Sequence, residues 1–166
     1  MKTFDVIALG ELNVDLILNR IAGFPEVGKE IFARDMICTL GSSTAIFAAN
    51  VSALGARTAF AGMIGRDAFG ELVRGSLEAR GVDTRYVIEA ADRATGVTVV
   101  MSYGEDRANV TYPGAMEALR FADLDPEIFL SARHIHLSSL FMQPGLLADI
   151  VPILRAAHDG GATVSL

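Results

Sequence analysis

The sequence predicts an α/β fold in which a mostly parallel sheet is flanked by helices and carries a small extra β-layer. Two observations support this: β-prone and helical segments alternate along the chain, and a β-hairpin pattern is inserted between them. Hydrophobic residues make up 51% of the 166 residues and charged residues only 20%, which is typical of a chain that buries much of its apolar surface. A single domain is expected at this length.

The first half of the chain opens with an apolar run, Val6 to Leu9, which predicts a buried central strand. Alternation of apolar and polar residues continues this β pattern to Leu18. Small apolar residues before Gly55 predict a helix that packs closely on a sheet. The elements expected here are strands at 5–18 and 29–40, a helix at 44–54, a strand at 57–61, and a helix that Asp67 caps and Gly81 ends.

The second half begins with two β-prone runs separated by the polar turn 104–107, which is a hairpin signal. Such a hairpin needs a partner sheet, so we expect it to form the extra layer with the earlier strands. The elements expected here are strands at 95–103, 109–112, 134–140 and 162–166, and a helix at 146–159 with a kink at Pro152.

Composition limits the classes of partner. A formal net charge of -6 without any Lys/Arg cluster argues against nucleic acid or an anionic membrane surface, and favours a small molecule or a protein. Cys38 is the single cysteine, so no internal disulfide can form. No signal-peptide pattern opens the chain, and apolar stretches are interrupted well short of the roughly 20 residues of a membrane helix. We therefore expect a cytoplasmic protein.

Three motifs of other protein classes fail on context. Residues 23–30 match the spacing of a phosphate-binding loop, but Glu30 stands where a hydroxyl belongs and a β pattern follows instead of a helix. No Gly-x-Gly-x-x-Gly follows the first strand, so a nicotinamide-dependent enzyme has little support. His134 and His136 share one strand face without a third ligand nearby, which favours structural histidines and no metal site.

Polar residues after the first strand are more informative. Asn13 and Asp15 alternate and therefore project to one side, where a carboxylate and an amide can hold adjacent hydroxyls, although a strand-end turn explains them equally well. Gly41, Ser42 and Ser43 lie between a strand and a helix, where a polar ligand can approach the backbone. A helix N-cap by Ser43 is the alternative, and both can hold at once.

In order and spacing, five segments resemble the ribokinase-like, or PfkB-type, sugar kinases over nearly the whole chain. Each match is weak alone, and together they are strong. The segments are VIALGELNVD at 6–15, GSSTAIFAANVSALG at 41–55, Gly62 to Gly70 with Asp67, Gly81 to Thr84, and the lid hairpin from Thr95 to Ala115. The resemblance implies a Rossmann-like sheet with a β-sheet lid, whose strands lie within 15–18, 29–40 and 96–113.

The same resemblance implies roles for individual residues. The substrate-binding set is Asn13 and Asp15 on sugar hydroxyls, Gly41, Ser42 and Ser43 in the same pocket, and Thr98, Val100 and Thr111 covering it from the lid. Ser42 replaces a second Gly of many members, and Ile46 replaces an Asn that often binds the sugar. These two departures leave the identity of the sugar open.

The family carries its catalytic Asp, anion hole and adenine pocket in a C-terminal part that residues 1–166 do not match. We therefore expect the N-terminal part of a kinase domain, with sugar-binding residues but no catalytic, cofactor or metal site. ATP and Mg²⁺ would serve a longer parent, and this chain alone is expected to be inactive. A homodimer through the lid sheet is also expected. A stand-alone ligand-binding or dimerisation module without catalysis remains the alternative.

Overall fold

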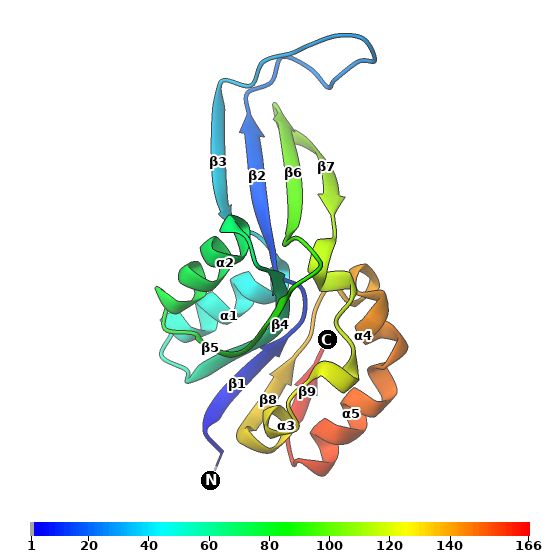
Figure 1. Cartoon of the computed structure of the whole chain (residues 1–166). Helices are drawn as coiled ribbons and strands as arrows, with labels where there is room; N and C mark the ends of the chain where they lie inside the picture. Colours follow the sequence, from blue (N-terminus) through cyan, green and yellow to red (C-terminus); the bar gives the residue numbers. More distant parts are fainter. Residues whose placement is uncertain (1) are drawn as a thin grey trace.

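Two β-sheets organise the chain, and the smaller one projects from one end of the larger one (Figure 1). The computed structural model describes residues 2–166. The larger sheet has the order β5-β4-β1-β8-β9, and all its neighbouring strands are parallel. Its strands are β1 (Phe4–Leu9), β4 (Thr58–Gly65), β5 (Asp83–Ala90), β8 (Ala132–His136) and β9 (Thr163–Ser165).

The smaller sheet, called the lid below, has the order β3-β2-β6-β7. Its strands are β2 (Asn13–Asn19), β3 (Asp35–Leu40), β6 (Gly96–Tyr103) and β7 (Asp106–Tyr112). β2 pairs antiparallel with β3 and parallel with β6, and β6 and β7 form the expected hairpin. The predicted α/β fold, with a parallel sheet and a second small sheet, is confirmed.

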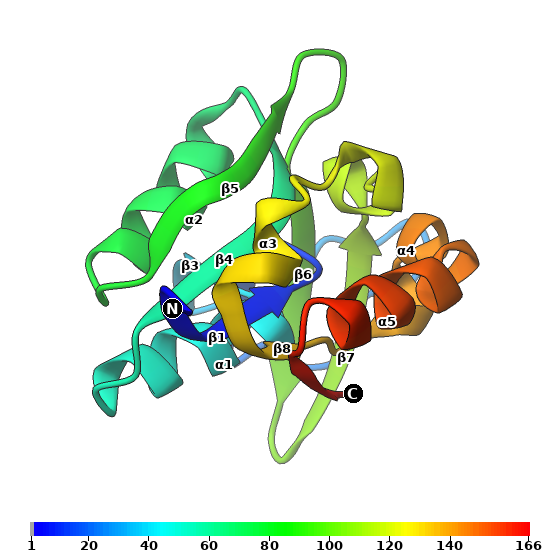
Figure 2. The ribbon, with the colours of Figure 1, turned by 90° about the horizontal axis from the view of Figure 1, so that it is seen from below.

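Helices cover both faces of the larger sheet (Figure 2). α1 (Ser43–Ala53) and α2 (Ala68–Glu78) pack their small and aliphatic residues on one face, where Ala45, Ala48, Val73 and Leu77 are fully buried. α3 (Glu127–Ser131), α4 (Pro144–Ala148) and α5 (Ile150–Asp159) lie on the other face, with the short turns η1 (Gly114–Glu117), η2 (Phe121–Asp123) and η3 (Leu140–Met142). Each face therefore has its own hydrophobic core.

Several predicted strand boundaries are wrong. The single strand expected at 5–18 is divided, because the chain leaves the large sheet after Leu9 and enters the lid at Asn13. The strand expected at 29–40 begins only at Asp35, since its partner β2 ends at Asn19. The strand expected at 134–140 ends at His136, and β5 was not predicted at all.

The predicted helices need one correction. The helix expected at 146–159 is two helices, and the break lies at Asp149, whereas Pro152 sits in the first turn of α5, where proline is tolerated. Asp67 caps α2 as predicted, and its side chain accepts a hydrogen bond from the Gly70 N–H. Within residues 2–166, no helix has both the length and the apolarity that a membrane crossing requires.

Candidate functional site

A cavity of about 440 Å³ lies where the lid meets the carboxyl ends of β1 and β8 and the N-terminus of α1. Ligands of α/β folds commonly bind at the carboxyl ends of parallel strands. The cavity is lined by Glu11, Asn13, Asp15, Ser42, Ser43, Thr98, Val100, Arg107, Asn109, Thr111, Ser139 and Met142. Seven of the eight residues predicted from the sequence are in this set, and the eighth, Gly41, packs directly beneath two of them.

Lid register explains why these residues share one surface. Asp15 on β2 is opposite Thr98 on β6, and Thr98 is opposite Thr111 on β7, so the three side chains form one row on the same face. The next row on this face contains Val100 and Asn109, which are also paired. The lid thus presents a polar row near its base and a mixed row farther out.

Asn13 orients the polar row. Its side-chain amide donates hydrogen bonds to Asp15 Oδ1 and Thr98 Oγ1, both at 3.0 Å. The Thr98 and Thr111 hydroxyls are also 3.0 Å apart, which extends the network across three strands. These bonds hold Asp15 in place, and leave its second carboxylate oxygen without a partner among residues 2–166.

Burial raises the pKa of the Asp15 carboxyl above its ordinary value, and the hydrogen bond from Asn13 opposes this only in part. No cationic side chain of residues 2–166 forms an ion pair with Asp15. A half-buried carboxylate without a counter-ion is costly unless donors reach it. Ligand hydroxyls are donors of the right kind.

The loop before α1 gives the cavity its floor. A Cβ at Gly41 would lie 2.3 Å from Asp15 Oδ1 and 2.7 Å from Asn13 Nδ2, so only glycine allows both side chains to sit there. The N-cap of α1 is Ser42 and not Ser43, because the Ser42 hydroxyl accepts from the Ala45 N–H at 3.0 Å. Ile46 points away from this cavity, into a small hollow beside Thr39.

Glu11 is the main residue that sequence reasoning missed. Its side chain is only 2% exposed and accepts hydrogen bonds from the Ser43 hydroxyl, the Thr44 hydroxyl and the Gln143 amide, at 3.0, 2.6 and 3.0 Å. The Thr44 N–H also points to it, at 3.3 Å. Glu11 therefore ties the end of β1 to α1 and to the segment after β8. The available signal in the sequence was a charged residue two positions after an apolar strand.

The other missed residues are Arg107 and Asn109 on β7, and Ser139 and Met142 after β8. Alternation from Thr111 along β7 would have found Asn109 and Arg107, because residues two apart share a strand face. Ser139 turns the chain after β8 with a φ of 50°, and Met142 follows this turn. No local sequence pattern places either residue beside α1. The Ser139 hydroxyl reaches the Ser43 hydroxyl at 2.6 Å.

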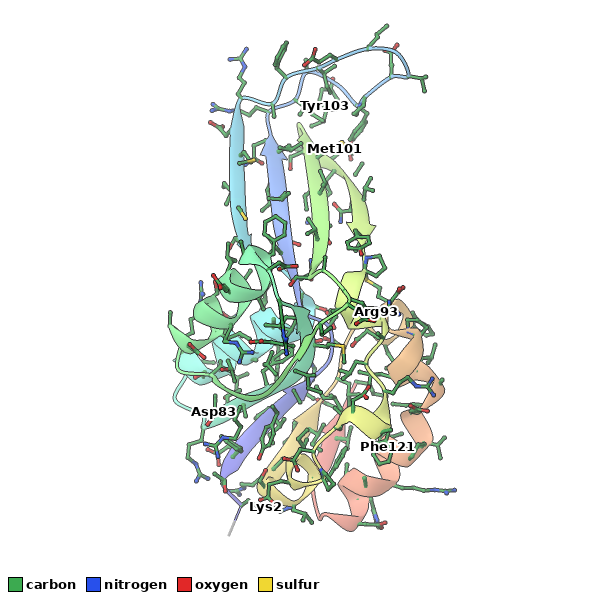
Figure 3. All side chains as sticks on the ribbon, viewed as in Figure 1. Lys2, Asp83, Arg93, Met101, Tyr103 and Phe121 are labelled. Carbon is green, nitrogen blue, oxygen red and sulfur yellow. The ribbon has the colours of Figure 1, made fainter. Side chains whose placement is uncertain are left out.

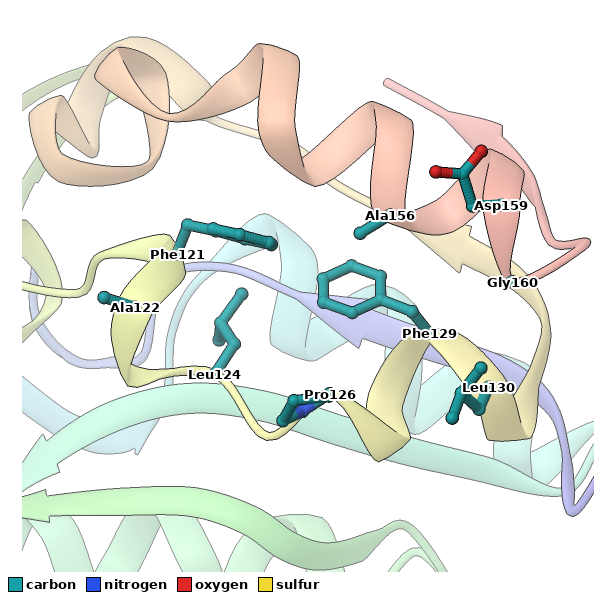
Figure 4. Close-up of a pocket in the computed structure, with 9 residues that line it drawn as sticks. All are labelled: Phe121, Ala122, Leu124, Pro126, Phe129, Leu130, Ala156, Asp159 and Gly160. Atoms are coloured by element: carbon teal, nitrogen blue, oxygen red, sulfur yellow. The ribbon is translucent and has the colours of Figure 1, made fainter.

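A second hollow, of about 420 Å³, lies between α5 and the segment from η2 to α3 (Figure 4). It is lined mainly by apolar residues, among them Phe121, Leu124 and Phe129, with Asp159 at its edge. Because it lacks convergent polar groups, it has none of the features of a site for a hydroxylated ligand.

The motifs rejected in the sequence have ordinary structural roles. Residues 23–30 form a loop that opens no helix, as predicted. His134 and His136 hydrogen bond to the Ser165 hydroxyl at 2.8 Å each, and His136 stacks on Phe47. Among residues 2–166, no group of three His, Cys, Asp or Glu side chains is placed to hold a metal ion.

A model of the pfkB family of carbohydrate kinases matches residues 3–164. The chain belongs to this family. The resemblance found in the sequence is thereby confirmed. Among curated relatives, a nucleoside kinase from Methanothermobacter thermautotrophicus is 29% identical over 136 residues, covering 81% of this chain and 44% of that protein. A probable fructokinase-3 from Arabidopsis thaliana is 34% identical over 131 residues, covering 75% of this chain and 37% of that protein.

Solved pfkB-type structures share the fold. A PfkB protein from Polaromonas sp. JS666 superposes with a TM-score of 0.83 at 22% identity, covering 98% of this chain and 54% of that one. A putative ribokinase II from E. coli, in complex with ATP and Mg²⁺, has a TM-score of 0.82 at 23% identity, covering 98% of this chain and 52% of that one. The chain spans between 37% and 49% of the length of the curated relatives that it matches.

Proposed function

We propose that the protein is a carbohydrate kinase that transfers the γ-phosphate of ATP to a sugar hydroxyl, and that this chain carries the sugar-binding residues and the lid. One observation carries the proposal: the half-buried Asp15 carboxylate, held by Asn13, faces a polar cavity without any counter-ion among residues 2–166. Membership in the pfkB family supports the reaction class.

Six of the cavity residues have a defined part in this proposal. Asp15 accepts hydrogen bonds from substrate hydroxyls, and Asn13 keeps its carboxylate oriented. Thr98 and Thr111 contribute hydroxyls from above, while Val100 and Met142 offer apolar contact for ring carbons. Because the lid must cover the ligand for these contacts to form together, closure would also exclude water from the sugar.

We propose that residues 2–166 do not hold ATP or Mg²⁺. No acidic cluster suited to a metal ion is found in this part of the chain, and the glycine-containing loop 23–30 opens no helix toward a phosphate. We therefore assign substrate binding and no step of phosphoryl transfer to these residues, and we expect residues 1–166 alone to transfer no phosphate.

The test is an ADP-release assay with the full-length protein over pentoses, hexoses, sugar acids, sugar phosphates and nucleosides. Asp15→Asn keeps the shape of the side chain and removes its charge, so kcat/KM for the preferred sugar should fall by about tenfold to a hundredfold or more. Asp92→Asn, on an exposed loop, is the matched control and should leave kcat/KM unchanged. Equal activity of Asp15→Asn and native protein would refute the proposal.

We further propose that the outer face of the lid mediates a homodimer. The strand register places Leu16, Cys38, Val99 and Val110 in one row on this face, and Leu18, Met36 and Met101 in the next. Met36 and Val110 are 66% and 62% exposed, and Met101 and Tyr103 lie toward the far end of the lid (Figure 3). An apolar face of this extent favours association. It also supports the alternative of a dimerisation module without catalysis.

A further inference from the structure

Arg107 is the one Lys or Arg side chain that lines the candidate cavity. It lies on β7, two residues before Asn109 and four before Thr111 in the sequence, and therefore on the same face of the lid as both. Its guanidinium forms no hydrogen bond or ion pair with any of residues 2–166, whereas Arg20, elsewhere on the lid, is paired with Asp35. The five N–H donors of Arg107 are thus available to a ligand in the cavity.

Charges in the cavity are separated along the lid. The carboxylates of Glu11 and Asp15 lie at its base, and Arg107 lies at its outer end. Since a strand rises about 3.3 Å per residue, the backbone positions of Thr111 and Arg107 are about 13 Å apart. Val100 and Asn109 occupy the intermediate row. A ligand that uses both ends must therefore carry hydroxyls at one end and a group that suits a cation at the other.

We propose that Arg107, assisted by the Asn109 amide, binds an anionic group of the substrate, so that the preferred substrate is a sugar acid or a sugar phosphate and not a neutral sugar. The inference rests on the proposed function and names its substrate class. A guanidinium matches carboxylate and phosphate oxygens with two parallel hydrogen bonds. The same anion would be repelled by Asp15 and Glu11, so the two ends of the cavity fix the orientation of the substrate.

The departure at Ile46 agrees with this inference. Ile46 does not line the cavity and carries no amide, so α1 has no side-chain amide there to hold a further hydroxyl. The side-chain donors at the outer end of the cavity, Arg107 and Asn109, come instead from β7. Since Arg107 is exposed, its pairing with an anion remains open to salt, and the affinity should fall as ionic strength rises.

Matched pairs of neutral and anionic sugars test the inference by calorimetric titration of the full-length protein without ATP: glucose with gluconate, fructose with fructose 6-phosphate, and ribose with ribose 5-phosphate. The anionic member of the preferred pair should bind about tenfold to a hundredfold more tightly. Arg107→Gln should abolish this preference, because it removes the cation and lowers the affinity for the anionic member by about tenfold to a hundredfold. Arg20→Gln, which removes a lid arginine outside the cavity, should preserve it.

The pairs also separate the two sources of negative charge. Arg107→Lys retains a point charge that suits phosphate but loses the planar pairing with carboxylate, so it should weaken gluconate more than a sugar phosphate. A neutral sugar that binds at least as tightly as its anionic partner, or a preference that survives in Arg107→Gln, overturns this inference and leaves the proposed function intact. If no sugar of either kind binds, the proposed function fails as well.

Discussion

At the scale of a single residue, Asp15 is a side chain that the fold holds in place at the expense of stability. Burial raises the pKa of its carboxyl, and the one hydrogen bond that it accepts from a side chain, from Asn13, does not reverse this. A carboxylate whose folded-state pKa is raised costs stability at every pH above its unfolded pKa of about 3.9. Such a cost is expected where a group serves binding.

The sign of this shift predicts a pH dependence. Sugar affinity of the native protein should fall as pH drops through the raised pKa of Asp15, because the protonated carboxyl accepts hydrogen bonds less well. In Asp15→Asn the affinity should be low and insensitive to pH, while the free energy of unfolding at pH 7 should equal or exceed that of native protein. Titrations and thermal unfolding between pH 4 and pH 8 measure both, and an Asp15→Asn protein that is markedly less stable at pH 7 would contradict this account of Asp15.

Gly41 gives a second prediction at this scale. In Gly41→Ala the added methyl would displace Asp15 and Asn13 together, so sugar affinity should fall by more than about tenfold while the protein stays folded. Gly23→Ala is the matched control, because nothing lies within 4 Å of the Cβ that it adds. Calorimetric titration measures the sugar affinity of both variants, and circular dichroism verifies that they fold. Similar affinities of the two variants would show that close packing at Gly41 does not affect sugar binding.

Candidate site residues were predictable where a periodic pattern, a strand-to-helix loop or the family resemblance marked them. Alternation marked Asn13 and Asp15 and supported the pairing of Thr98 with Val100 that the resemblance supplied, because residues two apart on a strand share a face. Glu11 escaped, since it stands in the break between β1 and β2 and its partners are on α1 and after β8. Contacts of that kind depend on which segments the fold brings together.

At the scale of elements, the lid joins the rest of the fold at Thr95 and Gly114, a connection called the hinge below. The N-cap of α2, Asp67, holds the Thr95 side of this hinge by hydrogen bonds. The Asp67 carboxylate caps α2 through the Gly70 N–H and also accepts from the N–H and hydroxyl of Thr95, all at 2.8 Å. Thr95 directly precedes β6, and its hydroxyl accepts from the Gly65 N–H at 2.9 Å. On the other side of the hinge, Gly114 packs against Ala94. A Cβ at Gly114 would lie 2.3 Å from the Ala94 carbonyl oxygen.

Asp67→Asn should loosen this hinge. Partial burial opposes ionisation of Asp67, but the hydrogen bonds from Thr95 and Gly70 outweigh it and lower its pKa. The ionised group therefore adds stability above its unfolded pKa of about 3.9, and that stability is lost as pH falls through the lower folded pKa. An Asn side chain has one acceptor oxygen where the carboxylate has two, so one of the groups that now donate to Asp67 loses its acceptor. We expect a loss of about 1–3 kcal/mol in unfolding free energy at pH 7, a smaller loss near pH 3, and faster amide exchange in β6 and β7. Unfolding curves and amide exchange that match those of Asp92→Asn at both pH values would rule out this role.

The lid-mediated dimer is tested by charge on the outer face. Val110→Glu should convert a dimer into a monomer in sedimentation experiments, because a carboxylate would be buried unpaired at the interface. Leu130→Glu replaces a comparably exposed residue on α3, far from the lid, and should remain dimeric. Native protein that sediments as a monomer at high concentration would exclude the interface.

Strands were missed or given wrong ends where one side is exposed or where the neighbouring strand stops early. β5 is an edge strand with the exposed residues Arg85 and Glu89, so it shows no continuous apolar run. Residues 29–34 have a β pattern but lie beyond the end of β2, and a strand without a partner does not form. The 134–140 segment ends as a strand at His136, because its following residues turn toward Glu11 and α1.

For the whole molecule, the cavity arises because the lid joins the large sheet at the carboxyl ends of its strands (Figure 1). The sequence predicted both sheets and most of the lining residues, since these follow from local periodicity and family resemblance. It could not predict that Ser139 and Met142, which follow β8, face the same space as the lid. The substrate-class inference rests on the separation of Arg107 from Asp15 and Glu11 within that space.

A crystal structure of the full-length protein with its preferred sugar would show directly whether this cavity binds the sugar. We expect sugar hydroxyls within hydrogen-bond distance of Asp15 and Thr98, with the ring against Val100 and Met142. A sugar found in the hollow beside Phe121 and Phe129, or one that makes no contact with Asp15, would contradict it.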